Sequence, residues 1–147
     1  KYNMMDIQAA MGLHQLPRLA RYLRRREAIW TRYNEAFAEL PITLPPDPDP
    51  DTVHARHLYQ ILIDPDRCGV DRDTVQQRLQ EQRIGTGIHF ISLHLHPYYR
   101  KTFGYRRGDF PNAEYVSDRT LSLPLSAKLT DEDVDDVIAA LRRALRV

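Results

Sequence analysis

The spacing of apolar residues predicts a long helical region at the N-terminus. Apolar positions three and four residues apart, between Leu16 and Leu40, are typical of one face of a long amphipathic helix. A shorter stretch precedes it, for which Asp6 can serve as N-cap. Pro17 separates the two stretches and predicts a kink or a restart, because proline is tolerated best at a helix start. The members of the long stripe are Leu16, Leu19, Leu23, Trp30, Tyr33, Phe37 and Leu40.

Three further helices are predicted along the chain. Asp71 can cap a helix that buries Val75 and Leu79, and we expect Gly85 to end it as a left-handed residue. Residues 112–119 predict a short helix. Residues 130–133 resemble a capping box with acids in the first turn, where the helix dipole favours them. The buried stripe of this last helix consists of Val134, Val137, Ile138, Leu141 and Leu145.

Short apolar runs between these helices predict strands. They cover residues 57–63, 87–91 and 121–125, whereas the proline- and aspartate-rich segment 41–52 predicts an exposed loop. Short strands separated by helices indicate a small sheet with helices packed on it. The expected fold class is therefore α/β or α+β with a long N-terminal helix, built as one domain over residues 1–147.

Composition narrows the class of protein but not its activity. The chain is 42% hydrophobic and 28% charged, with 21 Lys and Arg against 20 Asp and Glu, which gives no net attraction to nucleic acid or an anionic membrane. It has no apolar run long enough for a membrane helix and no signal peptide. The single cysteine, Cys68, excludes an intramolecular disulfide and fits a reducing compartment. We expect a soluble cytoplasmic domain with neither a nucleic-acid nor a membrane partner.

Three histidines lie close together in sequence and suggest polar chemistry. His89, His94 and His96 fall within one short segment, and a His-x-His pair in a strand would place both rings on one face. That arrangement is half of a zinc site, but no cysteine or acid completes the ligand set. Polar lining of a cleft is therefore preferred to a metal site, and loop histidines with satisfied hydrogen bonds remain an alternative. The glycines at 85 and 87 would let the backbone bring His89 close to a cleft.

Other candidate groups have simpler interpretations. The basic run at residues 24–26 suits a solvated or subunit-facing helix surface better than nucleic acid, because no aromatic platform accompanies it. Cys68 has no histidine nearby in sequence to activate it. Lys1, Lys101 and Lys128 stand in no special setting.

A series of short motifs runs along the whole chain, from the first residue to the final helix. They lie at residues 2–12, 24–27, 32–33, 57–59, 84–90, 96–99, 110–114 and 121–125. No single motif is specific, but their order together resembles that of the DegT/DnrJ/EryC1/StrS aminotransferase family. Within the family, the forms at residues 1–3, 67–69 and 85–87 are most similar to the branch of the UDP-4-amino-4-deoxy-L-arabinose–oxoglutarate aminotransferases.

The resemblance implies a fold-type-I enzyme that uses pyridoxal 5'-phosphate (PLP). A large domain would hold the cofactor through a lysine Schiff base, and a small C-terminal domain would close over it, in homodimers with sites at the subunit interface. The reaction would move an amino group from glutamate, which becomes 2-oxoglutarate, to a nucleotide-linked keto-sugar. The family's lysine precedes the motif at residues 2–12, so residues 1–147 are expected to be the small C-terminal domain without that lysine and inactive alone. Lys1 is not its equivalent.

The resemblance also assigns residue roles. Asn3 resembles the asparagine that reaches the cofactor phosphate of the neighbouring subunit, and His89 resembles the histidine that lines the sugar-nucleotide pocket. Tyr2, Phe90 and Tyr98 are expected in the same wall. No catalytic residue and no metal ligand is expected in this chain, and no PLP is expected to bind to it alone. Two alternatives stay open: a non-catalytic binding or dimerisation domain, and a histidine-based metal-binding domain.

Overall fold

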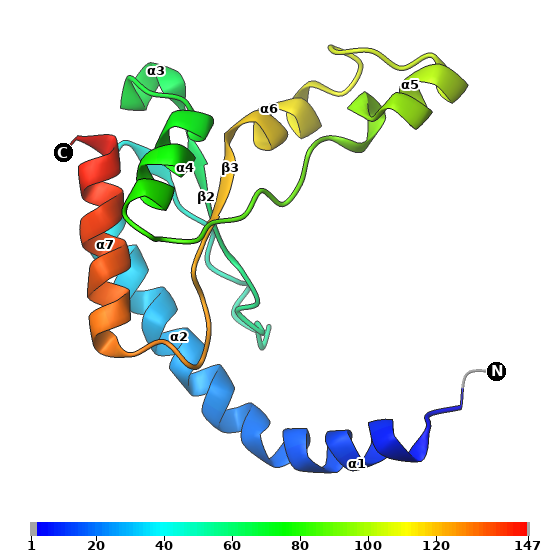
Figure 1. Ribbon diagram of the computed structural model, residues 1–147, viewed down its shortest axis with the longest axis vertical. Coiled ribbons are helices and arrows are strands. Elements are labelled where there is room, and N and C mark those ends of the chain that lie inside the picture. Colours follow the sequence, from blue (N-terminus) through cyan, green and yellow to red (C-terminus); the bar gives the residue numbers. More distant parts are fainter. Residues whose placement is uncertain (1–2, 147) are drawn as a thin grey trace.

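The computed structural model describes residues 3–146. The helical elements, in chain order, are α1 (Asp6–Gln15), the 3₁₀ turn η1 (Leu16–Arg18), α2 (Leu19–Phe37), α3 (Pro65–Cys68), α4 (Arg72–Glu81), the 3₁₀ turn η2 (Leu93–Leu95), α5 (Pro97–Phe103), α6 (Pro111–Arg119) and α7 (Asp131–Leu145), and the strands are β1 (Ile42–Thr43), β2 (Tyr59–Ile63) and β3 (Thr120–Leu123). The described residues are mainly helical, with short strands β1 and β2 in succession after α2 and β3 just before α7 (Figure 1), so the strict alternation of helix and strand that the sequence predicts is not found.

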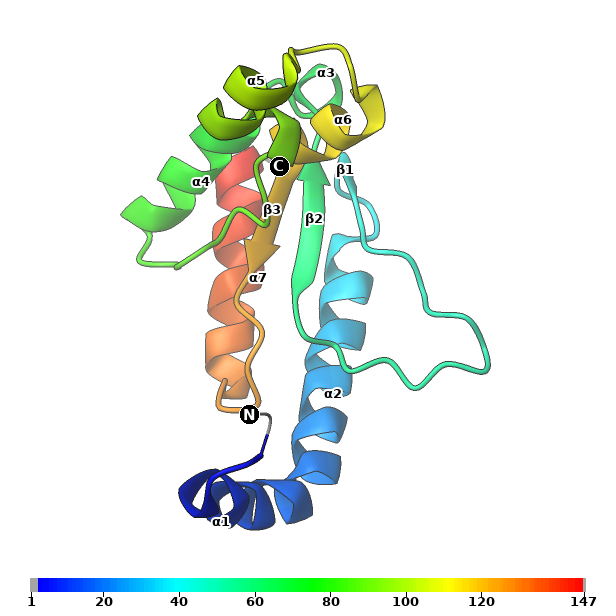
Figure 2. The ribbon, with the colours of Figure 1, turned by 90° about the vertical axis from the view of Figure 1, so that its right-hand side faces the viewer.

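The strands form one antiparallel sheet in the order β1-β2-β3. Tyr59 pairs with Leu123, and Ile61 pairs with Leu121, so one face of the sheet is apolar and buried. Helices α2, α4 and α7 pack on that face (Figure 2), and their buried side chains join the sheet in one core cluster. This is the mixed helix-and-sheet class that the sequence predicts.

The two polar positions on the sheet's other face matter for the site. Gln60 of β2 lies directly opposite Ser122 of β3, so both side chains belong to the same face of the sheet. That face is opposite the core formed by Tyr59, Ile61 and Leu121. The segment that follows α4 pairs with the edge of β3 at Gly87 and Ser122, and then reaches this face, where Gln60 Nε2 donates to the carbonyl of His89.

Helix ends follow local chemistry, with two departures from expectation. Thr130 and Asp133 form the predicted capping box of α7. At α1, however, Met5 and not Asp6 is the N-cap residue, and Asp6 is the first helical residue. The polar support comes from Gln8, whose side-chain oxygen accepts a hydrogen bond from the Met5 amide at 3.0 Å.

The predicted end of α4 at Gly85 is wrong. The left-handed residue is Arg83, with φ of 64°, and the amides of Arg83 and Ile84 donate to the carbonyls of Gln80 and Leu79. These two bonds form a Schellman motif. Such a motif is usually accompanied by an apolar contact between two positions, which are those of Ile84 and Leu79 here. Ile84 packs against the core. That packing outweighs the cost of a left-handed arginine, about 1 kcal/mol.

Two other sequence expectations need correction. Residues 87–91 do not form a strand: only Gly87 pairs with the sheet, and the apolar residues Phe90 and Ile91 are exposed. Conversely, the predicted loop at residues 41–52 contains the short edge strand β1, which pairs with β2 at Ile63 and Leu62. The first error arises because an apolar run does not reveal whether a partner strand is available, and the second because two residues at the start of a proline-rich segment are enough to pair at a sheet edge.

The long N-terminal stripe is buried only in its second half. Trp30, Tyr33 and Phe37 are in the core, but Leu16 and Leu19 are 69% and 61% exposed. The chain restarts at Pro17 through η1, and α1 buries no side chain at all. The helices therefore leave the core as an N-terminal arm, which is residues 3–19.

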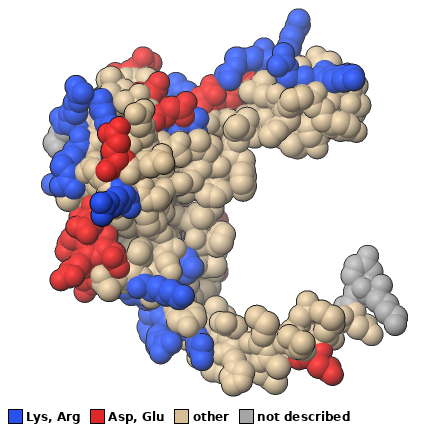
Figure 3. All heavy atoms as spheres, viewed as in Figure 1, with Lys and Arg blue, Asp and Glu red and all other residues tan. Residues whose placement is uncertain are grey.

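A second arm projects to the same side of the molecule. We call residues 92–110 the α5 arm, since α5 lies at its outer end (Figure 1). In the space-filling view the two arms enclose a broad hollow (Figure 3). Its inner surface shows almost no Lys, Arg, Asp or Glu, whereas basic residues gather on the outer side of the α5 arm.

Candidate functional site

His89 is held against the polar face of the sheet by contacts to both strands. Its Nδ1 lies 2.8 Å from Ser122 Oγ, and its carbonyl oxygen accepts a hydrogen bond from Gln60 Nε2 at 2.9 Å. The backbone beneath the ring is anchored too, because Gly87 and Ser122 exchange amide-to-carbonyl hydrogen bonds of 3.1 and 2.8 Å. The ring of His89 is thus fixed in position and in plane.

Gly87 is required for this close approach. A Cβ atom at position 87 would lie 2.6 Å from Cε1 of the His89 ring, nearer than any side chain tolerates. The sequence predicted that the glycines at 85 and 87 bring His89 tightly into place, and the structure assigns that role to Gly87. Gly85 has no atom within 4 Å of its ideal Cβ position.

The other ring nitrogen of His89 is available for a ligand. Within residues 3–146, Nε2 makes no hydrogen bond, while Nδ1 is engaged with Ser122. A ring whose Nδ1 is fixed by a hydroxyl can present Nε2 as donor or acceptor, according to its tautomer. This arrangement suits recognition of a hydroxyl or phosphate oxygen.

Phe90 extends the surface beside His89. The two rings meet edge to face with centroids 4.9 Å apart, and Phe90 is 74% exposed. Phe90 also borders a groove of about 490 Å³, lined by Ile88, Phe90, Ile91, Leu93 and His96. An exposed aromatic beside a fixed histidine is the usual wall of a polar-ligand site.

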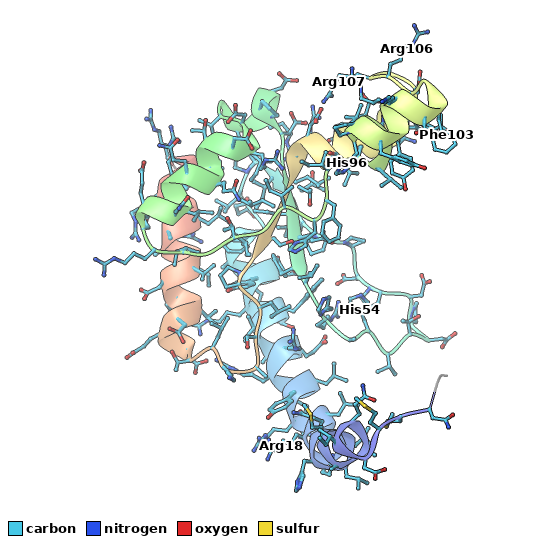
Figure 4. All side chains as sticks on the ribbon, turned by 45° about the vertical axis from the view of Figure 1, so that its right-hand side comes forward. Arg18, His54, His96, Phe103, Arg106 and Arg107 are labelled. Carbon is cyan, nitrogen blue, oxygen red and sulfur yellow. The ribbon has the colours of Figure 1, made fainter. Side chains whose placement is uncertain are left out.

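Tyr98 lies farther out, on α5. It is 66% exposed and packs edge to face against Tyr99 and Phe103. Figure 4 shows Phe103 on the same arm as His96, and Arg106 and Arg107 near the arm's outer side; the guanidinium of Arg107 turns back to Asp118 of α6 at 2.7 Å. The structure therefore places Tyr98 on the arm that frames the hollow, and does not place it beside His89.

Asn3 is on the opposite side of the hollow. It is exposed and precedes α1, in the N-terminal arm. The segment that carries Asn3 and the segment that carries His89 are separated by the hollow (Figure 1), so one chain does not bring them together. Tyr2, and likewise Lys1, lies outside the described residues.

His94 is a structural residue of the α5 arm. It is in η2 and not in a strand, so it does not share a strand face with His96 as the sequence suggested. Its Nε2 lies 2.8 Å from Glu114 Oε1, and both residues are buried, whereas His96 is exposed. Among residues 3–146, no three His, Cys, Asp or Glu side chains are placed to hold a metal ion.

The basic run on α2 is used largely within the chain. Arg25 donates to the carbonyl of Leu129 and pairs with Asp131, and Arg26 donates to the carbonyl of Arg56. These bonds tie α2 to the start of α7 and to the approach to β2. The guanidinium groups of Arg25 and Arg26 are therefore engaged within the chain and do not form a basic surface for a partner.

Sequence reasoning missed the residues that hold His89. Ser122 and Gln60 each interrupt an apolar strand with a polar side chain, and that interruption was the available signal. What the sequence could not show was the register that sets the two residues opposite each other.

Among the helices of the described part of the chain, none is both long and apolar enough to cross a membrane.

The fold is that of a known class of protein. The chain superimposes on part of the aminotransferase TlmJ from Streptoalloteichus hindustanus with a TM-score of 0.84 and 31% identity, covering 96% of this chain and 36% of TlmJ. It also matches Spr1654 from Streptococcus pneumoniae, a candidate sugar aminotransferase in its PLP form, with a TM-score of 0.87 and 31% identity over 98% of this chain and 36% of that one. The architecture is that of one part of an aminotransferase.

The chain belongs to the DegT/DnrJ/EryC1/StrS aminotransferase family, whose model matches residues 1–142. It is 50% identical over 143 residues to the spore coat polysaccharide biosynthesis protein SpsC of Bacillus subtilis. It is also 50% identical over 143 residues to the uncharacterized protein MJ1066 of Methanocaldococcus jannaschii. In both cases the match covers 97% of this chain and 37% of the relative, so the chain spans little more than a third of their length.

Proposed function

We propose that this chain is the small C-terminal domain of a PLP-dependent sugar aminotransferase that moves an amino group from glutamate to a nucleotide-linked keto-sugar. The observation that carries the proposal is His89, fixed through Nδ1 by Ser122 and through its carbonyl by Gln60, with Nε2 making no hydrogen bond within residues 3–146. The family match and the similarity to SpsC, a polysaccharide biosynthesis protein, support a sugar substrate.

The residues divide into two half-sites. His89 and Phe90 form the sugar-facing wall, and the α5 arm with Tyr98 acts as a lid over it. Asn3 contributes from the N-terminal arm to the site of the neighbouring subunit in a homodimer, and Tyr2, which lies outside the described residues, is assigned to the sugar-facing wall. The separation of Asn3 and His89 across the hollow supports this division, because a single chain leaves each half-site incomplete.

The described residues fit only a peripheral share of a PLP site. PLP supplies an electron sink that makes amino transfer possible. The amide of Asn3 is a suitable donor to its phosphate, but Lys101 and Lys128 are exposed. We therefore assign the lysine that holds PLP to a segment outside residues 1–147 and expect no transfer by this chain alone. His89 binds and orients the sugar, and Phe90 excludes water beside it.

Finer assignments extend the same proposal. We assign the chain to the branch that makes UDP-4-amino-4-deoxy-L-arabinose, because its residues 1–3, 67–69 and 85–87 are most similar to that branch. The co-substrate pair is glutamate and 2-oxoglutarate, and the site of action is the cytoplasm.

A first experiment adds PLP to the purified protein, records its absorbance spectrum, reduces with borohydride and maps the lysines by mass spectrometry. We expect no shifted absorbance band and no stoichiometric adduct on a defined lysine. A stoichiometric adduct on Lys101 or Lys128 would show that the chain holds its own cofactor site and would refute the division proposed above.

A second experiment tests the partner-subunit role in the longer protein. Subunits carrying Asn3→Ala are mixed with subunits whose upstream cofactor lysine is replaced, and amino transfer from glutamate is measured. If Asn3 acts on the neighbouring subunit, the mixed dimer regains about one active site of two. If the mixture is no more active than Asn3→Ala subunits alone, Asn3 acts within its own subunit. Asn112→Ala, which changes a matched exposed asparagine on α6, is the control and should be fully active.

A non-catalytic binding or dimerisation domain is the second candidate. The observation in its favour is the apolar surface of the N-terminal arm, where Met4, Met5, Ile7, Met11 and Leu13 are each at least 61% exposed. Such a domain would self-associate or bind a partner without any dependence on His89. A His89→Asn variant separates the two, because it removes sugar binding and leaves association unchanged.

A further inference from the structure

Glu114 is a buried carboxylate at the root of the α5 arm. It lies in the first turn of α6 and is 6% exposed. Its Oε1 accepts hydrogen bonds from the Gly108 amide and from His94 Nε2, each at 2.8 Å, and Arg107 Nη1 lies 3.7 Å from Oε2. One side chain thus binds three groups of the arm.

These partners come from both ends of the arm. His94 is on the part of the chain that leaves the core, and Gly108 is on the part that returns to it. A second link lies one turn along α6, where Ser117 Oγ accepts a hydrogen bond from the Ser92 amide at 2.9 Å. Helix α6 therefore closes the loop of residues 92–110 at its base, and Glu114 is the residue that contacts both sides.

The carboxylate is suited to this position by its charge. Burial opposes ionisation, but hydrogen bonds from the Gly108 amide and from His94 outweigh it, and the pKa of Glu114 is held below its usual range. An apolar side chain of similar size would leave the buried imidazole of His94 and the part-buried amide of Gly108 without an acceptor, which is costly. The outer part of the arm is held by aromatic contacts instead. Phe103 of α5 stacks with Tyr99 and Tyr105, and Tyr105 meets Phe110 edge to face.

We infer that Glu114 is a positioning residue for the sugar site: by joining His94 to Gly108 it fixes the α5 arm, and with it His96 and Tyr98, relative to His89. The consequence for substrate binding rests on the proposed function, whereas the effect on the arm does not. Glu114 touches no substrate in this scheme and acts only through the arm.

Hydrogen–deuterium exchange of the purified protein tests the effect on the arm directly. In Glu114→Ala we expect the amides of residues 96–108 to exchange at least about tenfold faster, because a local opening loses its main restraint. Amides of β2, β3 and α7 should stay within about twofold of the parent protein. Glu132→Ala, an exposed acid in the first turn of α7, is the matched control and should change neither region.

Two further variants keep the inference falsifiable if Glu114→Ala does not fold. Glu114→Gln retains an oxygen that accepts from both partners, so exchange in the arm should stay close to that of the parent. Glu114→Asp keeps the charge but is one methylene shorter, and it should lose one partner and speed exchange in the arm. Unchanged exchange in the arm of Glu114→Asp, or an equal increase in arm and core, would overturn the inference.

Kinetics of the longer protein then test the consequence for the sugar. We expect Glu114→Asp to raise KM for the sugar several-fold with a smaller change in kcat, and Glu114→Gln to restore the parent values. If the parent shows no amino transfer, the proposed function fails while the exchange experiment still decides the role of Glu114. If the arm loosens but KM does not change, the positioning role is refuted and the proposed function stands.

Discussion

Replacing Gly87 by alanine tests whether the place of the His89 ring depends on a missing side chain. A Cβ at position 87 would lie 2.6 Å from Cε1 and 3.3 Å from Nδ1 of the ring. Carbon atoms in contact prefer about 3.5–4.0 Å, so the ring has to move by about 1 Å. The backbone is no obstacle, because Gly87 is not among the glycines with positive φ.

The expected effects on stability and on binding differ strongly. Moving the ring breaks the hydrogen bond between His89 and Ser122, which costs about 1 kcal/mol. The alanine also restricts the unfolded chain, which stabilises the protein by about 0.4–1 kcal/mol. The free energy of unfolding should therefore change by less than about 1 kcal/mol. Sugar binding and turnover should fall by about a hundredfold, since a displacement of about 1 Å can have that effect.

Gly85→Ala is the matched control for this substitution. It lies in the same turn, and no atom is within 4 Å of its ideal Cβ position. The measurements are thermal unfolding, the ¹⁵N chemical shifts of the His89 ring, and the affinity of the longer protein for its sugar substrate. Unchanged ring shifts in Gly87→Ala, or an equal loss of affinity in both variants, would refute the argument that Gly87 sets the position of His89.

Two more predictions concern the core and the helix ends. Arg83→Gly should raise the free energy of unfolding by about 1 kcal/mol and the melting temperature by about 2–4 °C, because glycine adopts the left-handed conformation of Arg83 without strain. A lower melting temperature would show that the contacts of the arginine side chain stabilise the protein by more than its backbone strain destabilises it. Burial raises the pKa of Tyr33 and Tyr59 above the usual range. The folded state then holds protons that the unfolded state releases above about pH 10, so stability should fall as the pH rises beyond that value. The absorbance of tyrosinate and circular dichroism, followed together, check this, and full ionisation of all tyrosines in a protein that keeps its native dichroism would contradict it.

The sequence predicted helices best where a residue pattern is compatible with only one local structure. The capping box at Thr130 and the stripe that begins at Val134 describe α7 as the structure has it. Asp71 caps α4 through the Thr74 amide, also as expected. In each case the signal is local, because a cap and an apolar face are set by residues within a few positions of one another.

Predictions failed where a partner distant in sequence decides the outcome. The end of α4 at Arg83 depends on where Ile84 packs, and the failure of residues 87–91 to form a strand depends on which groups pair with them. The role of His89 was foreseen from the family motif and remains a prediction. Its supports, Gln60 and Ser122, could not be foreseen, because their meeting requires the register of two strands that lie far apart in the chain.

The restart at Pro17 separates two helices, α1 and α2, that owe their order to different causes. Helix α2 is stabilised by the side chains that it buries in the core, but α1 has ten residues and buries none. A helix of that length is marginal in water without tertiary contacts, since nucleation is costly and each added residue contributes little. The helicity of residues 6–15 is therefore coupled to the covering of their apolar side chains. A probe of that helicity, such as the exchange rate of its amides, would report whether those side chains are covered.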